Sequence, residues 1–310
     1  MISLCPYCNS LKSAREDNHF CSQKVDLSSS IGNNAFYALT NQLQSGPHRS
    51  RLTIRYVSQG YQYYQVDGAE HLLSSDRYLM VDEGQNFNSE IKSEQAVELL
   101  IIAFRSQFIE ECLEQRKIQL DLPILPGLDF DRERMFFEST YPLQAPLIEL
   151  LHQVKTAIQT EDKRFFETDD IFVAIAGALL NAHQRILYQI DELQVTKSAT
   201  KLDLYQRISL AKDYMDVHFG KSLSLSEISQ IAAMSTYHFL RTFKHFYGMT
   251  PHQYLTQTRM NYAQYLLQYS GQSVAQIATE CGFENHSAFG RVFKKIKGQS
   301  PLQIKRTRKH

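Results

Sequence analysis

Two stretches near the end of the chain repeat each other and decide the fold of that half. Residues 223–244 read LSLSEISQIAAMSTYHFLRTFK, and residues 273–294 read SVAQIATECGFENHSAFGRVFK. FLRTFK at 239–244 aligns with FGRVFK at 289–294, and Ile228 aligns with Ile277 one position closer. One extra residue therefore lies in the second copy, at 282–284. Each copy predicts a helix, a tight turn and a second helix, which is a helix-turn-helix unit.

The second helix of each copy is predicted to have one buried face and one free face. Phe239 and Phe243 are four residues apart, as are Phe289 and Phe293, so each pair packs on the preceding helix. Polar side chains occupy the remaining positions: Tyr237, His238, Arg241 and Lys244, then His286, Ser287, Arg291 and Lys294. A helix of this kind fits the ~12 Å major groove of DNA. The helix expected at 251–269 would hold the two units roughly 28 Å apart, close to one duplex turn.

The charge of the chain is divided between its two parts. Residues 201–310 carry 15 Lys and Arg against 6 Asp and Glu, a net charge of +9. Residues 1–200 carry 18 against 27, a net charge of −9. A basic part favours a polyanion as partner, and the alternative is a solvated basic face without a partner.

Residues ~205–306 resemble the DNA-binding domain of the AraC/XylS family of bacterial regulators, on the two runs quoted above. The resemblance implies base contacts by Tyr237, Leu240 and Arg241, and by His286, Ser287, Gly290 and Arg291. It places Thr236, His238 and Asn285 near phosphates. Two departures are Gly290, which lacks the usual side chain and costs the helix about 1 kcal/mol, and Ile304 in place of a tyrosine. The alternatives are that Arg241 and Arg291 form ion pairs or caps, and that Tyr237 is a packing residue. Cys281 is expected to be buried.

The sequence pattern of the first half predicts short strands followed by helices. Strand-forming runs at 51–57, 61–66 and 77–81 are separated by turn signals such as Asp67-Gly68. The apolar run 96–104 has the length of a strand, although a helix is not excluded. This pattern predicts a sandwich or small barrel. Helices are expected at 106–116, at 146–159 and from Asp169 or Asp170 to about Leu193, before a polar linker at 195–201.

This half is similar to the cupin-like sensor domain of many AraC-type regulators, on YQVDG at 64–68 and RYLMVDEGQ at 77–85. The resemblance implies a barrel that holds an effector and helices that dimerise. The alternative is that these helices pack only within one chain. Aromatic and polar groups suit a small polar ligand. The candidate lining residues, half of which could instead face solvent, are Arg51, Arg55, Tyr56, Tyr61, Tyr63, Tyr64 and His71. No His-x-His pattern with a following carboxylate and His occurs, which disfavours a metal-dependent cupin enzyme.

Two further features concern the N-terminus and membranes. Cys5, Cys8, His19 and Cys21 leave three interpretations open: bound zinc, a redox pair, or a tail without a ligand. The longest apolar run, 171–180, is about half the ~20 residues that span a bilayer and predicts a buried helix. No secretory signal is recognised, so we expect a cytoplasmic protein.

The sequence therefore predicts an α+β chain. Residues 1–30 are irregular, 31–195 form a cupin-like barrel with helices for effector sensing and dimerisation, 196–203 form a linker, and 204–310 form an all-α DNA-binding domain. The expected function is a homodimeric transcriptional regulator that binds double-stranded DNA, a small-molecule effector and RNA polymerase. No membrane, cofactor, metal or catalytic site is expected. One alternative is an enzymatic or thiol-reactive N-terminal half, such as an alkyl acceptor using Cys5 or Cys8. Another is a constitutive regulator whose first half only dimerises.

Overall fold

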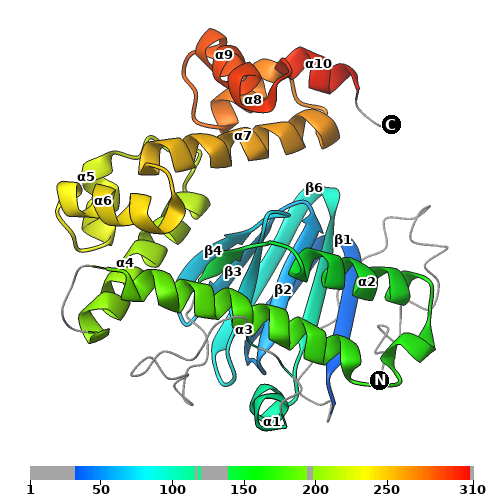
Figure 1. The fold of residues 1–310 in the computed structure, drawn as a ribbon. Helices are drawn as coiled ribbons and strands as arrows, with labels where there is room; N and C mark the ends of the chain where they lie inside the picture. Colours follow the sequence, from blue (N-terminus) through cyan, green and yellow to red (C-terminus); the bar gives the residue numbers. More distant parts are fainter. Residues whose placement is uncertain (1–31, 116–117, 119, 121–138, 194–197, 308–310) are drawn as a thin grey trace. The chain divides into compact units, whose positions relative to one another are not determined.

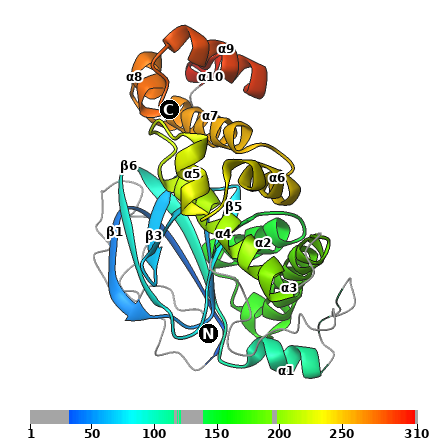
Figure 2. The ribbon, with the colours of Figure 1, turned by 90° about the vertical axis from the view of Figure 1, so that its left-hand side faces the viewer.

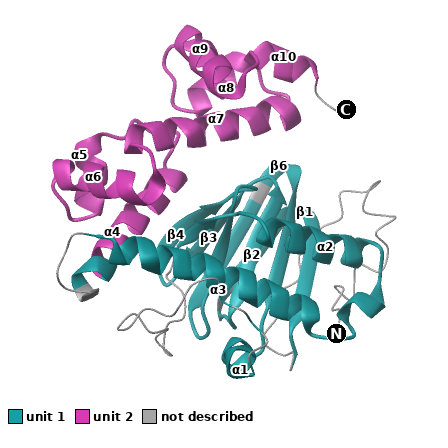
Figure 3. Ribbon diagram, viewed as in Figure 1, with its two compact units in different colours: residues 1–202 teal, residues 203–310 magenta. Residues whose placement is uncertain are grey.

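The computed structural model describes residues 32–115, 118, 120, 139–193 and 198–307. It divides into two compact units, residues 1–202 and residues 203–310 (Figure 3). Each unit has its own hydrophobic core, and the division falls one residue before the expected start of the second domain at 204.

Unit 1 contains a nearly closed antiparallel barrel (Figure 1). The strand order is β4-β3-β6-β2-β5-β7, and β1 pairs along the length of β6. The predicted small barrel is confirmed, and the run 96–104 ends the long strand β6. The strands are β1 Asn34–Arg49, β2 Thr53–Gln59, β3 Gln62–Val66, β4 Ala69–Leu73, β5 Arg77–Val81, β6 Asn86–Ala103 and β7 Thr140–Pro142.

The turn between β3 and β4 is formed by the two residues predicted for it. Asp67 has φ 44° and Gly68 has φ 90°. A two-residue hairpin of type I′ needs positive φ at both positions, and Asp-Gly is one of the sequences that adopt it most easily. This turn sets the register in which Tyr64 pairs with His71 and Gln62 pairs with Leu73.

The helices of unit 1 lie on one side of the barrel wall (Figures 1 and 2). They are α1 Phe108–Glu114, α2 Leu147–Gln159, the 3-10 turn Lys163–Phe166 and α3 Asp170–Asp191. Ile54 and Ile102 of the wall share one core with Leu151 of α2 and Ile175 of α3. α3 has the length and composition of a membrane span, but 56% of that stretch is buried within the protein. The prediction of a buried helix is confirmed.

Helices are the only regular secondary structure among the residues of unit 2 that the structure describes. Its helices are α4 Ser198–Val217, α5 Leu225–Ile231, α6 Thr236–Tyr247, α7 Pro251–Tyr269, α8 Val274–Glu280, α9 His286–Lys297 and α10 Pro301–Arg306. The segment expected to be the linker, 196–203, is helical from Ser198 onward. The segment contains no Gly or Pro to stop a helix, and Lys201 anchors it by donating to the carboxylate of Asp191 at 2.9 Å.

Candidate nucleic-acid interface

The two helix-turn-helix units, α5–α6 and α8–α9, are built from matching local signals. Ser224 caps α5 by accepting a hydrogen bond from the Glu227 amide, and Ser273 caps α8 in a capping box with Gln276. In the turns, Ala233 and Gly282 occupy equivalent positions with φ 47° and 74°. The next residue of each turn donates to a carbonyl of its first helix, from Met234 to Ser229 and from Phe283 to Ala278.

The second helices have the same length and the same kinds of cap. α6 and α9 each contain 12 residues. Ser235 and Asn285 cap their starts, and Gly248 and Gly298 end them in the left-handed conformation. The turns are equivalent up to Phe283, so the extra residue of the second unit is Glu284. The predicted one-residue insertion is confirmed.

The apolar faces of these helices are fully used in packing. Phe239, Phe243, Phe289 and Phe293 are all 0% exposed, as their spacing predicts. Phe289 and Phe293 share a core with Leu267 of α7 and with Cys281. Ile304 of α10, which stands where the resemblance leads us to expect a tyrosine, is buried in the same core. α6 and α9 therefore each have one free face.

That free face carries a matched stripe of side chains on each helix. On α6 the stripe is Tyr237, Leu240, Arg241 and Lys244, and on α9 it is Ser287, Gly290, Arg291 and Lys294. Each set has the helical spacing i, i+3, i+4, i+7, which places its members on one face. Leu240 and Gly290 are partly buried, and the other stripe residues are exposed, as are Thr236, His238, Asn285 and His286.

The structure distinguishes between the two interpretations of the stripe residues. Tyr237 is 77% exposed, so it is not a packing residue. Arg241, Lys244, Arg291 and Lys294 make no hydrogen bond or ion pair with any residue in the described ranges. Four cations at equivalent positions on two equivalent helices are therefore available to a partner.

Arg259 of α7 has a structural role instead. Its Nε donates to the carbonyl oxygen of Phe219 at 2.7 Å, and its Nη2 donates to that of Lys221 at 2.7 Å. Phe219 and Lys221 follow the end of α4 at Val217, so Arg259 ties the chain just beyond this end to the middle of α7. The sequence alone does not indicate this role for Arg259, because nothing in its neighbours along the chain separates a tethering arginine from a free one.

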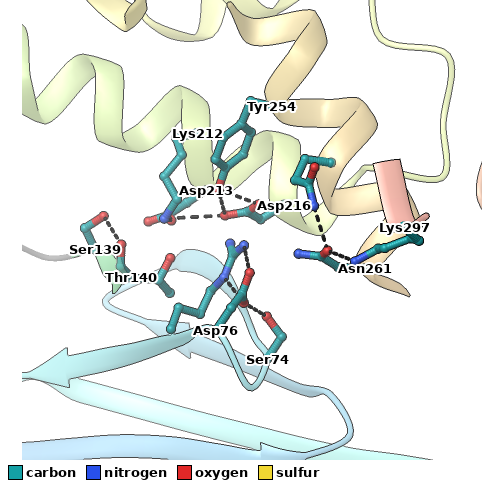
Figure 4. Close-up of polar contacts among 12 residues, drawn as sticks. Ser74, Asp76, Ser139, Thr140, Lys212, Asp213, Asp216, Tyr254, Asn261 and Lys297 are labelled. Carbon is teal, nitrogen blue, oxygen red and sulfur yellow. Dashed lines mark hydrogen bonds and ion pairs between the residues drawn. The ribbon is translucent and has the colours of Figure 1, made fainter. Parts of the chain in front are cut away.

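A buried ion cluster makes a second connection between α4 and α7 (Figure 4). Lys212 Nζ lies 2.5 Å from a carboxylate oxygen of Asp213 and 3.4 Å from one of Asp216. The Tyr254 hydroxyl of α7 donates to Asp216 at 2.9 Å. Removing one member of a buried charge cluster leaves another charge without compensation. The cluster and Arg259 together hold the helix that joins the two helix-turn-helix units.

The barrel of unit 1 contains only some of the residues predicted to line it. Arg55 and His71 are 3% and 2% exposed, whereas Tyr63 is 51% exposed because β3 alternates between the two faces of the wall. Tyr63 therefore faces out and Tyr64 faces in. Tyr56 belongs to the core shared with the helices, outside the barrel. Arg51 is partly buried and donates to the Gly32 carbonyl, and Tyr61 is partly buried just before β3.

Arg55 lies between aromatic rings inside the barrel. Its guanidinium carbon is 3.8 Å from the ring centre of Phe87 and 5.4 Å from that of Tyr64. The Tyr64 hydroxyl donates to Oε1 of Gln62 at 2.7 Å. Gln62, 1% exposed, was not predicted, although it lies two residues before Tyr64 and so on the same face.

The charge of Arg55 is not balanced by the groups around it. Burial lowers the pKa of Arg55, and no carboxylate of the described residues pairs with it. A desolvated cation over a ring gains about 2 kcal/mol, whereas burying an ion costs several kcal/mol. The rings alone therefore do not offset the cost of burying this cation.

The structure describes two of the five cysteines. Cys112 and Cys281 are buried and reduced, and burial raises the pKa of Cys281 to about 12. The prediction that Cys281 is buried is confirmed. Cys5, Cys8, His19 and Cys21 lie outside the described residues. Within the described part of the chain, no three His, Cys, Asp or Glu side chains gather where they could hold a metal ion.

A small barrel joined to two helix-turn-helix units with exposed cationic helices defines a protein of the DNA-binding class. Models of known families match both the barrel unit and the helix-turn-helix unit. The AraC-like ligand binding domain matches residues 41–170, and a helix-turn-helix domain matches residues 228–307. The chain belongs to the AraC family.

Individual relatives match parts of the chain. The probable transcriptional regulator LumQ of Photobacterium leiognathi is 29% identical over 152 residues, covering 49% of this chain and 58% of LumQ. The HTH-type transcriptional activator RhaR of Escherichia coli (strain K12) is 36% identical over 126 residues, covering 40% of this chain and 41% of RhaR. The chain thus spans about half the length of these relatives.

Two solved structures each match about a third of the chain. The C-terminal domain of AraT, a response regulator from Geobacillus stearothermophilus, is 30% identical and covers 34% of this chain and 87% of its own, with a TM-score of 0.33. The DNA-binding domain of AdpA in complex with a target DNA is 28% identical and covers 32% and 90%, with a TM-score of 0.32.

Proposed function

We propose that this protein is a sequence-specific, DNA-binding transcriptional regulator. The observation that carries the proposal is the pair of matched stripes on α6 and α9, with Arg241, Lys244, Arg291 and Lys294 unpaired among the described residues. A helix with one buried face and a cationic free face can enter the major groove. Two such helices joined by the 19-residue α7 suit two adjacent groove segments.

The roles proposed for the individual residues follow from their places on the helices. Arg241 and Arg291 can each form two hydrogen bonds to a guanine edge. Tyr237 and Leu240 offer apolar contact to bases, and His286 and Ser287 offer hydrogen bonds. Thr236, His238, Asn285, Lys244 and Lys294 contact phosphates. Because Gly290 and Ser287 stand where the first stripe has Leu240 and Tyr237, the second unit reads fewer bases than the first.

The proposal extends to the first unit and to the assembly. The barrel binds a small-molecule effector, whose binding changes how the second unit engages DNA, a coupling between two sites. The protein acts in the cytoplasm as a homodimer that contacts RNA polymerase, and it is not an enzyme. The support is the match of residues 41–170 to a ligand binding domain and the names of its relatives as transcriptional regulators.

Fluorescence anisotropy with a labelled duplex of mixed sequence tests DNA binding. The logarithm of affinity should fall linearly with the logarithm of salt concentration, by about 0.9 per phosphate neutralised. Lys244→Gln should lower this slope by about 0.9, and Arg164→Gln, an exposed arginine of unit 1, should leave it unchanged. Absence of binding at 50 mM salt, or equal slopes for all three proteins, would contradict the proposal.

A further inference from the structure

The polar cluster of Arg55, Gln62 and Tyr64, here called the Arg55 cluster, lies inside the barrel. Arg55 of β2 stands opposite Leu79 of β5 and Ile101 of β6, and both of these belong to the barrel's apolar core. Tyr64 belongs to the same core, and Gln62 precedes it by two residues on one strand face. All three polar residues are at most 3% exposed.

The hydrogen bonds of the Arg55 cluster leave only donors unused. The guanidinium carbon of Arg55 lies 5.4 Å from the ring centre of Tyr64, whose hydroxyl donates to Oε1 of Gln62. The two buried atoms that lack a partner are Nε of Arg55 and Nε2 of Gln62, and both carry N–H groups. A group that satisfies them must supply acceptors, and the permanent charge of Arg55 favours an acceptor that is negative.

The surroundings of the cluster indicate what the rest of the ligand resembles. Phe87 lies over the guanidinium, and Val57, Ile91 and Leu99 belong to the same interior core. These residues offer an anion no further hydrogen bond through their side chains, so the body of a ligand held there would be apolar.

We propose that the Arg55 cluster binds the anionic group of the effector, a small molecule with a carboxylate or phosphate attached to an apolar body. The inference rests on the proposed function, in which this barrel is the effector domain. Arg55 supplies the charge, and Gln62 supplies a neutral donor. Tyr64 positions Gln62 by its hydrogen bond and contacts Arg55 with its ring.

Three probes share a phenyl ring and differ in the polar group that it carries: benzoate, phenyl phosphate and the neutral benzamide. The melting temperature of the full-length protein is measured with each, and with acetate and inorganic phosphate. At least one anion should raise it, by on the order of 3 °C once the probe exceeds its Kd tenfold. Benzamide should have no effect. The anion that raises the melting temperature more shows whether the site prefers a carboxylate or a phosphate.

Variants connect the response to the cluster. Arg55→Met should abolish the response and should melt no lower than the wild type without probes, because it removes an uncompensated buried charge. Gln62→Leu should keep the response with an affinity about tenfold weaker, and it carries the test should Arg55→Met fail to fold. Arg49→Gln, which removes an exposed arginine of β1, should respond as the wild type does.

Several results would overturn the proposal. These are no shift with any of the four anions, an equal shift with benzamide, an unchanged anion response in a folded Arg55→Met variant, or, where Arg55→Met does not fold, an unchanged anion response in Gln62→Leu. Binding of the wild-type protein to duplex DNA without probes is measured on the same preparation. DNA binding without an anion response removes this proposal alone, whereas an anion response without DNA binding removes the proposed function and leaves the anion site.

Discussion

The carbonyl oxygen of Gly220 lies against Gly282, so closely that a Cβ atom on Gly282 would come within 2.7 Å of it. Gly220 follows α4, and Gly282 lies in the turn of the second helix-turn-helix unit. In the other direction, a Cβ on Gly220 would come within 2.8 Å of the Glu280 carbonyl oxygen. Two backbone segments about sixty residues apart are thus in direct contact, next to the Arg259 tether. This contact fixes α8 and α9 relative to α4.

Gly282→Ala should therefore destabilise the protein by about 2 kcal/mol or more. A left-handed residue with a Cβ costs roughly 1–2 kcal/mol, and the clash with a backbone carbonyl adds to this. Gly298→Ala is the matched control, because Gly298 has nearly the same φ, 75°, with no atom within 4 Å of the new Cβ. Denaturant unfolding of both variants measures the difference. Equal losses would show that the Gly220 contact contributes nothing.

Gly290→Ala should have the opposite effect. Gly290 lies within α9, and a Cβ there meets no atom within 4 Å. Alanine should stabilise the helix by about 0.8–1 kcal/mol, which thermal unfolding detects as a higher melting temperature. A lower melting temperature would mean that α9 needs glycine for a reason that the structure does not show.

His183 of α3 should make the protein sensitive to mild acid. Burial lowers its pKa to about 4, so the folded protein keeps this imidazole neutral. An unfolded chain binds the proton from about pH 6.5 downward. His183 therefore does not change the free energy of unfolding above about pH 6.5. As the pH falls toward 4, it lowers that free energy by roughly 3 kcal/mol in total.

Melting curves at pH 7.5 and pH 5.0 test the prediction for His183. His183→Gln, which cannot be protonated, should lose less stability between the two pH values than the wild type does. His152→Gln removes an exposed histidine of α2 and should behave as the wild type. An equal acid response in all three proteins would rule out His183 as the group responsible.

The helix-turn-helix units could be predicted from sequence because their signals are local. Phenylalanine spacing sets the buried face, and Ser235, Asn285, Gly248 and Gly298 set the ends of both second helices. Each signal acts within a few residues. The stripe residues could be named for the same reason, since a helix with one buried face determines which residues are free.

The barrel was harder to predict because its structure depends on distant partners. β1 contains Gly46-Pro47 and many polar residues, and it forms by pairing with β6, whose partner residues lie 37 to 69 positions further along the chain. In β3 the choice between Tyr63 and Tyr64 depends on which face the sheet buries, and a shift by one residue reverses it. Tyr56 was assigned to the barrel interior, but its strand is buried on both faces, and its side chain packs on the helix side.

The most direct test of the central claim is selection of binding sites from a random duplex library by the full-length protein and two variants. The wild type should enrich two short sequence blocks about one helical turn apart. Arg241→Ala should relax the sequence preference of one block and Arg291→Ala that of the other, each at a cost of about 1–3 kcal/mol on the selected site. A single block, or both variants weakening the same block, would contradict the account in which α6 and α9 read adjacent segments of the major groove.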